Sequence, residues 1–194
     1  LVNSQLQGDE IVQFAHADIA VAVATENGLI TPIVRQADTL NVAQIARATA
    51  DLSERALRGA LTREEITGGT FTISNLGMHG IARFDAIINP PQVAILAVGA
   101  AEERVVARNG VPTVARMMTL TLSVDHRVID GAVGAGLERR PSGGAAGAGD
   151  GRARLIDDDD PGALGSGAGG KREDDDGAGF LQTLRQLIEQ PDSL

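Results

Sequence analysis

The 194-residue sequence contains no cysteine, tryptophan or tyrosine, and only four phenylalanines and three histidines. The absence of cysteine excludes disulfide bonds and zinc sites built from thiolates. With so few aromatic side chains, the core of the predicted domain has to be aliphatic. Basic residues are outnumbered, 17 against 26 acidic ones, which argues against nucleic acid or an anionic membrane as a partner. No apolar stretch approaches the roughly 18 residues of a membrane span.

Hydrophobic residues make up 43% of the sequence, enough for one domain with a sizeable core. Continuous or alternating apolar runs predict the strands, and Asn-Gly pairs mark two of the turns between them. Pro32 favours an edge or irregular position for the strand that contains it. The predicted strands are residues 19–24, 29–34, 70–74 and 92–98, followed by a hairpin with arms 104–108 and 114–124.

Residues 41–61 have the apolar spacing of an amphipathic helix. Asn41 can cap this helix, and Gln44 completes the pattern of a capping box. Thr62 and Glu65 repeat that pattern and predict a short second helix, which ends at the glycine pair 68–69. Strands and helices mix without strict alternation, so we expect an α/β sandwich with a mixed sheet.

Residues 137–179 differ in composition from the rest of the chain. They hold 12 of the 24 glycines and two runs of aspartate. Such a segment buries too little apolar surface to offset the entropy of ordering, so we interpret it as a flexible insertion. An acidic tether or a cation site is the alternative. Amphipathic helical spacing resumes at Phe180, which suggests that residues 180–194 belong with residues 1–136.

His126 and Ser74 each stand at the end of a predicted strand. Rigid strands hold such side chains while their tips reach a cleft. A histidine can accept a proton near pH 7, and a hydroxyl can donate to a developing oxyanion. From the residues alone, a paired surface histidine and a turn serine remain open alternatives. His79 lies in a glycine-flanked loop, where we interpret it as solvated, with a place in the site as the alternative. We interpret His16 as a structural or surface residue.

Four ordered stretches carry a family resemblance. They are residues 28–35 (GLITPIVR), 69–77 (GTFTISNLG), 88–96 (INPPQVAIL) and 125–131 (DHRVIDG). In sequence, order and spacing they resemble the dihydrolipoamide acyltransferases, the core components of 2-oxo acid dehydrogenase complexes. The loops at 74–80 and 88–92 look most like the acetyltransferase members, which serve pyruvate dehydrogenase complexes.

The resemblance implies the fold of coenzyme A-dependent acyltransferases similar to chloramphenicol acetyltransferase. It implies His126 as general base, Ser74 as oxyanion donor and Asp130 as a residue that organises the site, with His126 and Ser74 from adjacent subunits. Residues 75–77 (Asn75, Leu76 and Gly77) would contact coenzyme A. No metal is implied.

Family members form trimers that assemble into larger cores with 24 or 60 subunits. The partners implied are lipoyl domains, the decarboxylase component and dihydrolipoamide dehydrogenase, in the bacterial cytoplasm or the mitochondrial matrix. The front of the family's catalytic domain is absent here, and so is a lipoyl domain, so the lipoyl group would act in trans. The chain also starts without methionine, which suggests a piece of a longer protein.

Three other functions remain as alternatives. A serine hydrolase using Ser74 and His126 lacks the G-x-S-x-G elbow. A catalytically inactive core or binding subunit is disfavoured because family relatives of that kind have lost the histidine, which is retained here. A metal site from Asp125, His126 and Asp130 would have one histidine and no cysteine.

Overall fold

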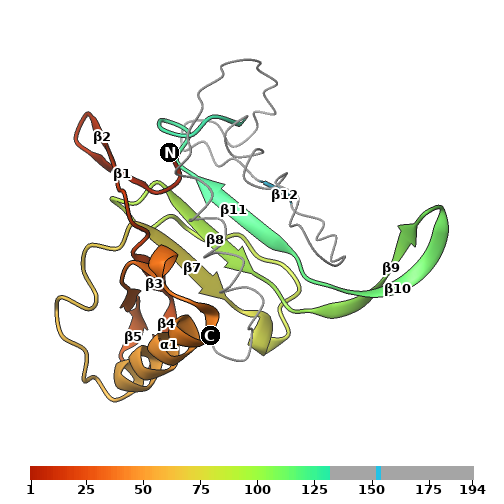
Figure 1. The fold of residues 1–194 in the computed structure, drawn as a ribbon, viewed down its shortest axis with the longest axis horizontal. Coiled ribbons are helices and arrows are strands. Elements are labelled where there is room, and N and C mark those ends of the chain that lie inside the picture. Colours follow the sequence, from red (N-terminus) through yellow and green to blue (C-terminus); the bar gives the residue numbers. More distant parts are fainter. Residues whose placement is uncertain (132–151, 154–194) are drawn as a thin grey trace.

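The structure is a computed structural model that describes residues 1–131 and 152–153. Its centre is a six-stranded sheet (Figure 1). In spatial order, the strands are β12 (Arg152–Ala153), β11 (Leu120–Val124), β8 (Ala94–Val98), β7 (Phe71–Asn75), β3 (Ile19–Val21) and β6 (Ile33–Val34). Strands β3, β7 and β8 run parallel, whereas β6 and β11 pair antiparallel with β3 and β8. The sheet is therefore mixed, as predicted.

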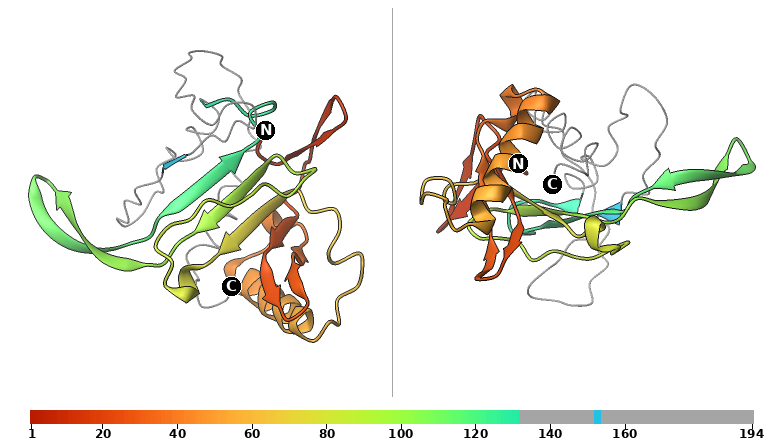
Figure 2. Two further views of the ribbon diagram at one scale, coloured as in Figure 1. Left: turned by 180° about the vertical axis from the view of Figure 1, so that it is seen from behind. Right: turned by 90° about the horizontal axis from the view of Figure 1, so that it is seen from below.

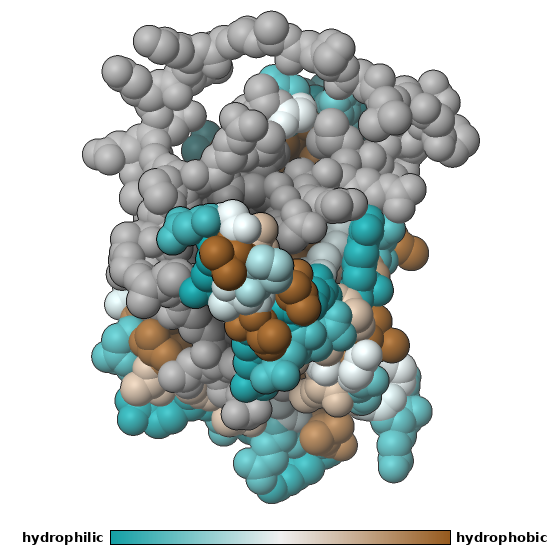
Figure 3. All heavy atoms as spheres, turned by 90° about the vertical axis from the view of Figure 1, so that its right-hand side faces the viewer, coloured by the Kyte–Doolittle hydropathy of each residue, from teal (hydrophilic) through white to brown (hydrophobic). Residues whose placement is uncertain are grey.

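Three antiparallel hairpins accompany the sheet: β1 (Ser4–Gln7) with β2 (Glu10–Gln13), β4 (Val23–Thr25) with β5 (Gly28–Ile30), and β9 (Glu102–Arg108) with β10 (Val111–Met117). Figures 1 and 2 show the β9–β10 hairpin projecting far from the rest of the protein. Its turn residues Asn109 and Gly110 both have positive φ, the conformation that tight hairpin turns favour. Val105, Val111 and Val114 on this hairpin are exposed, and Figure 3 shows hydrophobic and hydrophilic residues interspersed on this side.

Helix α1 (Val42–Leu57) begins with the predicted capping box. Asn41 accepts a hydrogen bond from the Gln44 amide, and the Gln44 side chain accepts one from the Asn41 amide. The helix buries Ile45 and Leu52 in the same core as the sheet. Two short 3₁₀ helices complete the described elements, η1 (Ala37–Thr39) and η2 (Gly77–His79).

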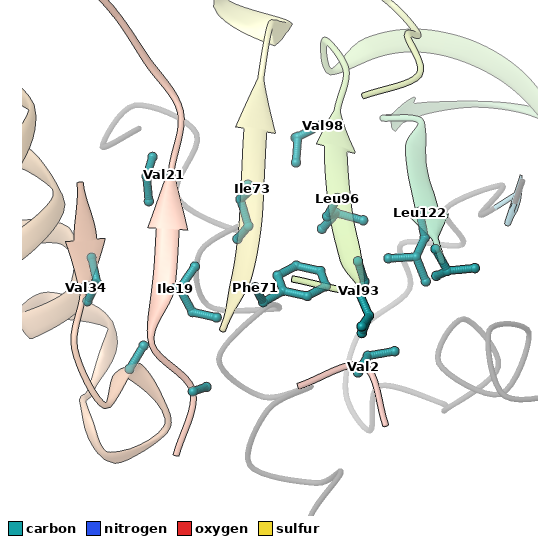
Figure 4. Packing of buried hydrophobic residues seen from close by; sticks show 14 of the residues in the cluster. Val2, Ile19, Val21, Val34, Phe71, Ile73, Val93, Leu96, Val98 and Leu122 are labelled. Atoms are coloured by element: carbon teal, nitrogen blue, oxygen red, sulfur yellow. The ribbon is translucent and has the colours of Figure 1, made fainter. Parts of the chain in front are cut away.

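The main core lies on one face of the sheet. Figure 4 shows its aliphatic side chains side by side on neighbouring strands, with Phe71 among them. A smaller cluster of Ile95 and Ala97 with Ala86 lies on the opposite face, because successive side chains of a strand point to opposite sides. The loop between η2 and β8 therefore covers the second face. Among the described residues, no helix has the length and hydropathy required to cross a membrane.

Four predicted elements differ from the structure. The strand predicted over 29–34 is divided at Thr31 and Pro32 into β5, which pairs with β4, and β6, which joins the central sheet. The strand predicted over 19–24 is two strands, because the chain leaves the sheet at Ala22. The helix predicted at Thr62 is wrong: this segment forms turns only. There the Glu65 carbonyl accepts from the Ile33 amide, which ties it to strand β6 instead of a helical partner. The hairpin arm predicted over 114–124 is divided between β10 and β11. The predicted segment 180–194, and all of 137–179 except β12, lie outside the described residues.

Candidate active site

His126 sits on a tight turn at the end of β11, and its side chain is exposed. The Asp125 amide donates to the Val93 carbonyl, which continues the pairing between β11 and β8 for one residue. The Asp125 carbonyl then accepts from the amides of Val128 and Ile129 at 3.0 and 2.9 Å. Because Ile129 is fully buried in the main core, the backbone on both sides of His126 is fixed while the imidazole faces solvent.

Asp125 and Arg127 form an ion pair that flanks the imidazole. The Arg127 guanidinium donates to both carboxylate oxygens of Asp125, at 3.0 and 2.7 Å, and the Arg127 amide donates to one of them. The side-chain hydrogen bond from Arg127 outweighs the opposing effect of burial and lowers the pKa of Asp125. Asp125 therefore stays ionised beside His126 at neutral pH.

Ser74 is the fourth residue of β7 and is half-buried. It pairs with Ala97 of β8, on the sheet face opposite the main core. Asn75 ends the strand, and its side-chain oxygen accepts from the Gly77 amide at 2.8 Å. The strand thus ends in a hydrogen-bonded turn that fixes the backbone next to Ser74.

The strand pairing separates Ser74 from His126 within one chain. Ser74 pairs with Ala97, and Ala97 pairs with Thr121. The paired part of β11 continues for four more residues to Asp125, which adds about 13 Å along the strands. Because β11 runs antiparallel to β8 and β8 runs parallel to β7, each of these four residues lies farther from Ser74 than the one before it. The two residues thus lie at opposite ends of the sheet, and one chain alone does not bring them together.

The other predicted site residues divide between these two ends. Asn75, Leu76 and Gly77 follow Ser74 directly and are half-buried, and His79 is exposed in η2 beside them. Asp130 is exposed and lies four residues after His126. Within residues 1–131, no three histidine or carboxylate side chains gather as a metal site would require.

His16 has a structural partner, in line with its interpretation from the sequence. Its Nδ1 lies 3.0 Å from Asp38 Oδ2. Burial acts to raise the pKa of Asp38, but hydrogen bonds from His16 and the Ala17 amide outweigh it, so the pKa is lowered. His16 lines an open cavity of about 410 Å³ with Asp18 and Arg35, which form an ion pair. None of the predicted site residues lines this cavity, and its charged groups already satisfy one another.

Two features near the candidate residues escaped the sequence interpretation. The pairing of Asp125 with Arg127 had a signal, opposite charges two positions apart next to the histidine. The close packing of Gly99 against the segment after Ser74 had none, because the residues that meet there are distant in sequence.

Comparison with known proteins identifies the family. The family model of the 2-oxoacid dehydrogenases acyltransferase (catalytic domain) matches residues 1–140. The chain belongs to this acyltransferase family. Dihydrolipoyllysine-residue acetyltransferase components of pyruvate dehydrogenase complexes are similar to it: those of Rickettsia felis (51% identity over 133 residues) and Zymomonas mobilis (50% over 131) each match 68–69% of this chain. A mitochondrial component of Arabidopsis thaliana is 50% identical over 136 residues.

The acyltransferase fold is confirmed by two solved structures. A dihydrolipoamide acetyltransferase of Azotobacter vinelandii, studied for the roles of a serine, a histidine and an asparagine in catalysis, matches with a TM-score of 0.64 and 36% identity. A cubic core of the pyruvate dehydrogenase multienzyme complex matches with a TM-score of 0.63 and 34% identity. Both matches cover 69% of this chain and 56% of the solved chain. The chain spans 25 to 33% of the length of its curated relatives.

Proposed function

We propose that this chain transfers an acetyl group between dihydrolipoamide and coenzyme A in the core of a pyruvate dehydrogenase complex. His126 is the general base, Ser74 the oxyanion donor and Asp130 a residue that organises the site. The acetyl group is favoured because the curated relatives, 47 to 51% identical, are named acetyltransferases.

The residue spacing carries this proposal. In the Azotobacter vinelandii enzyme the studied serine stands 52 positions before the histidine, and the asparagine stands four positions after it. Ser74 stands 52 positions before His126, and Asp130 four positions after it. Three residue positions with the same two separations, within a shared fold, support the same roles in this chain.

The chemistry suits these side chains. A free thiol has a pKa of about 8.5, so it is mostly protonated at neutral pH. His126 takes the thiol proton of coenzyme A while the sulfur attacks the thioester carbonyl of acetyl-dihydrolipoamide. The Ser74 hydroxyl donates to the oxyanion that forms. Collapse of the intermediate breaks the bond to the dihydrolipoamide sulfur, and the protonated imidazole returns the proton to that thiolate.

The sheet topology supports a site shared by two chains, because Ser74 and His126 stand at opposite ends of the same sheet. We therefore propose a homotrimer in which each site combines Ser74 of one chain with His126 of its neighbour. Asn75, Leu76 and Gly77, next to Ser74, are the proposed contacts of coenzyme A. A dihydrolipoyl group is the other proposed substrate, and the other two enzymes of the complex bind around the assembled core.

Acetyl transfer from acetyl-coenzyme A to free dihydrolipoamide tests the activity. We expect turnover by the unaltered chain, a kcat at least about 1000-fold lower in His126→Ala, and a decrease of about 100-fold in Ser74→Ala. Thr113→Ala, on the projecting hairpin, is the matched control and keeps its activity. An unaltered chain without transfer activity would instead favour a structural core subunit.

Mixing the two inactive variants tests the shared site. When His126→Ala and Ser74→Ala chains assemble at random, about a quarter of the sites combine an intact serine with an intact histidine. We therefore expect co-expressed variants to recover about a quarter of the normal activity. If the mixture is as inactive as either variant alone, the two residues do not act across a subunit boundary.

A further inference from the structure

We propose that Gly99 is a positioning residue for acyl transfer: its missing side chain lets the segment after Ser74 pack directly on the end of β8 and so fixes the oxyanion donor. This inference rests on the proposed function of Ser74. Gly99 follows the last residue of β8 and donates its amide to the Thr119 carbonyl at 2.9 Å. On the other side, the Ala100 amide donates to the Ile81 carbonyl at 2.8 Å.

The contact leaves no room for a side chain. A Cβ atom at Gly99 would lie 2.2 Å from the carbonyl oxygen of Ala82 and 3.2 Å from that of Thr119. A Cβ at Gly77 would lie 2.9 Å from the Gly99 carbonyl oxygen. All these neighbours are backbone atoms, so no side-chain rotation relieves the overlap. Neither glycine has the left-handed φ that favours glycine, so the requirement at both positions is space.

A displacement at Ala82 reaches Ser74 through a short, hydrogen-bonded path. The 3₁₀ turn η2 is closed by the amides of His79 and Gly80, which donate to the carbonyls of Leu76 and Gly77 at 3.1 and 3.0 Å. Leu76 also donates its amide to the Val98 carbonyl, immediately before Gly99. The turn therefore moves as a unit, and it begins three residues after Ser74.

The overlap predicts a shift large enough to affect catalysis. To restore an ordinary contact of 3.4 Å in Gly99→Ala, the Ala82 carbonyl has to retreat by about 1.2 Å. A misplacement of about 1 Å can cost up to 100-fold in rate, because an oxyanion donor acts only within hydrogen-bond distance. Substrate binding depends less on this one hydroxyl, so kcat changes more than KM.

A double-mutant cycle separates positioning of Ser74 from general damage. We expect Gly99→Ala to lower kcat about tenfold with KM changed less than twofold, and to cost less than twofold more in a Ser74→Ala background. Leu52→Ala, a core variant in α1, controls for lost stability. When it is assayed well below its unfolding temperature, its kcat should equal that of the unaltered chain. An equal loss with and without the Ser74 hydroxyl, or an unchanged kcat in Gly99→Ala, would overturn the proposal.

Amide hydrogen exchange gives a readout that does not depend on activity. Exchange of the His79 and Gly80 amides should be at least tenfold faster in Gly99→Ala than in the unaltered chain, and unchanged in Leu52→Ala. Unchanged exchange in Gly99→Ala would refute the positioning role even if the activity fell. Conversely, an inactive unaltered chain would refute the proposed function, while the exchange rates would still decide whether Gly99 holds the turn.

Discussion

Ile129 links the main core to the turn that carries His126. Truncating its side chain therefore tests both the stability of the core and the positioning of His126. The side chain is fully buried, and its amide bonds to the Asp125 carbonyl at 2.9 Å. Ile129→Ala removes three carbon atoms and leaves a cavity lined by core residues. Substitutions of this kind at fully buried sites cost about 2–5 kcal/mol. We expect the free energy of unfolding to fall by about 3 kcal/mol, within this range, because the side chain is fully buried.

Urea unfolding of the two proteins measures this difference, provided that the slope m stays constant. In thermal unfolding, the same loss lowers the midpoint by about 6–12 °C for a chain of this size. Leu57→Ala is the control: this leucine is also aliphatic but 66% exposed at the end of α1, so its truncation should cost about 0.5 kcal/mol or less.

The consequence for His126 follows from the same contact. Well below the unfolding temperature, Ile129→Ala should still lower kcat, because the turn has lost its anchor in the core. An Ile129→Ala protein as stable as Leu57→Ala would contradict the assignment of Ile129 to the core. A large loss of stability with unchanged kcat would show that the hydrogen bonds of the turn hold His126 without this side chain.

Three further substitutions have defined outcomes. Asp130→Asn should keep acetyl transfer within about tenfold, because an amide oxygen accepts hydrogen bonds as a carboxylate does and the Azotobacter vinelandii enzyme has asparagine at this spacing. Glu65→Gln should destabilise the protein at neutral pH, since hydrogen bonds from Arg55 lower the pKa of Glu65 from 4.5 to about 2. That stabilisation is complete above the unfolded pKa of 4.5 and disappears as the pH falls toward 2, so urea unfolding should give converging stabilities in acid. Thr72→Val should cost about 1–3 kcal/mol in the same assay, because Gln92 loses the buried donor of its 2.5 Å hydrogen bond.

Asp130→Asn and Thr72→Val each have a matched control variant, and the effect of Glu65→Gln is controlled by pH. Asp130→Ala removes the acceptor, and equal activity in the alanine and asparagine variants would show that Asp130 does not organise the site. For Glu65→Gln, a stability difference that persists below pH 2 would exclude the ionised pair with Arg55 as its cause. Thr72→Ser keeps the hydroxyl and should keep the hydrogen bond to Gln92, so a loss as large as that in Thr72→Val would show that retaining this hydroxyl is not enough to preserve the stability.

Local sequence patterns predicted the elements whose stability is local. The capping box of α1 needs only Asn41 and Gln44, and both side chains form their expected hydrogen bonds. The same pattern failed at Thr62. There the Glu65 side chain still accepts from the Thr62 amide, but its carboxylate also binds Arg55 and its carbonyl binds Ile33. These long-range partners stabilise a turn, and no pattern within the segment reveals them.

The same distinction applies to the candidate site. That Ser74 and His126 would end strands could be predicted from the apolar runs before them. Their separation could not, because it follows from the antiparallel pairing of β11 with β8, which the sequence does not specify. The need for glycine at position 99 was equally hidden, since it arises where the Ala82 carbonyl crosses the end of β8.

Strand β12 covers part of an edge of the central sheet, so a chain shortened to exclude it would expose that edge. Its two residues pair with Thr121 and Leu122 along the outer side of β11. Removing them would leave a row of amide and carbonyl groups without partners, and such rows recruit strands from other polypeptides. A truncated chain would therefore be prone to aggregate through backbone hydrogen bonds along β11, even with every side chain of the core intact.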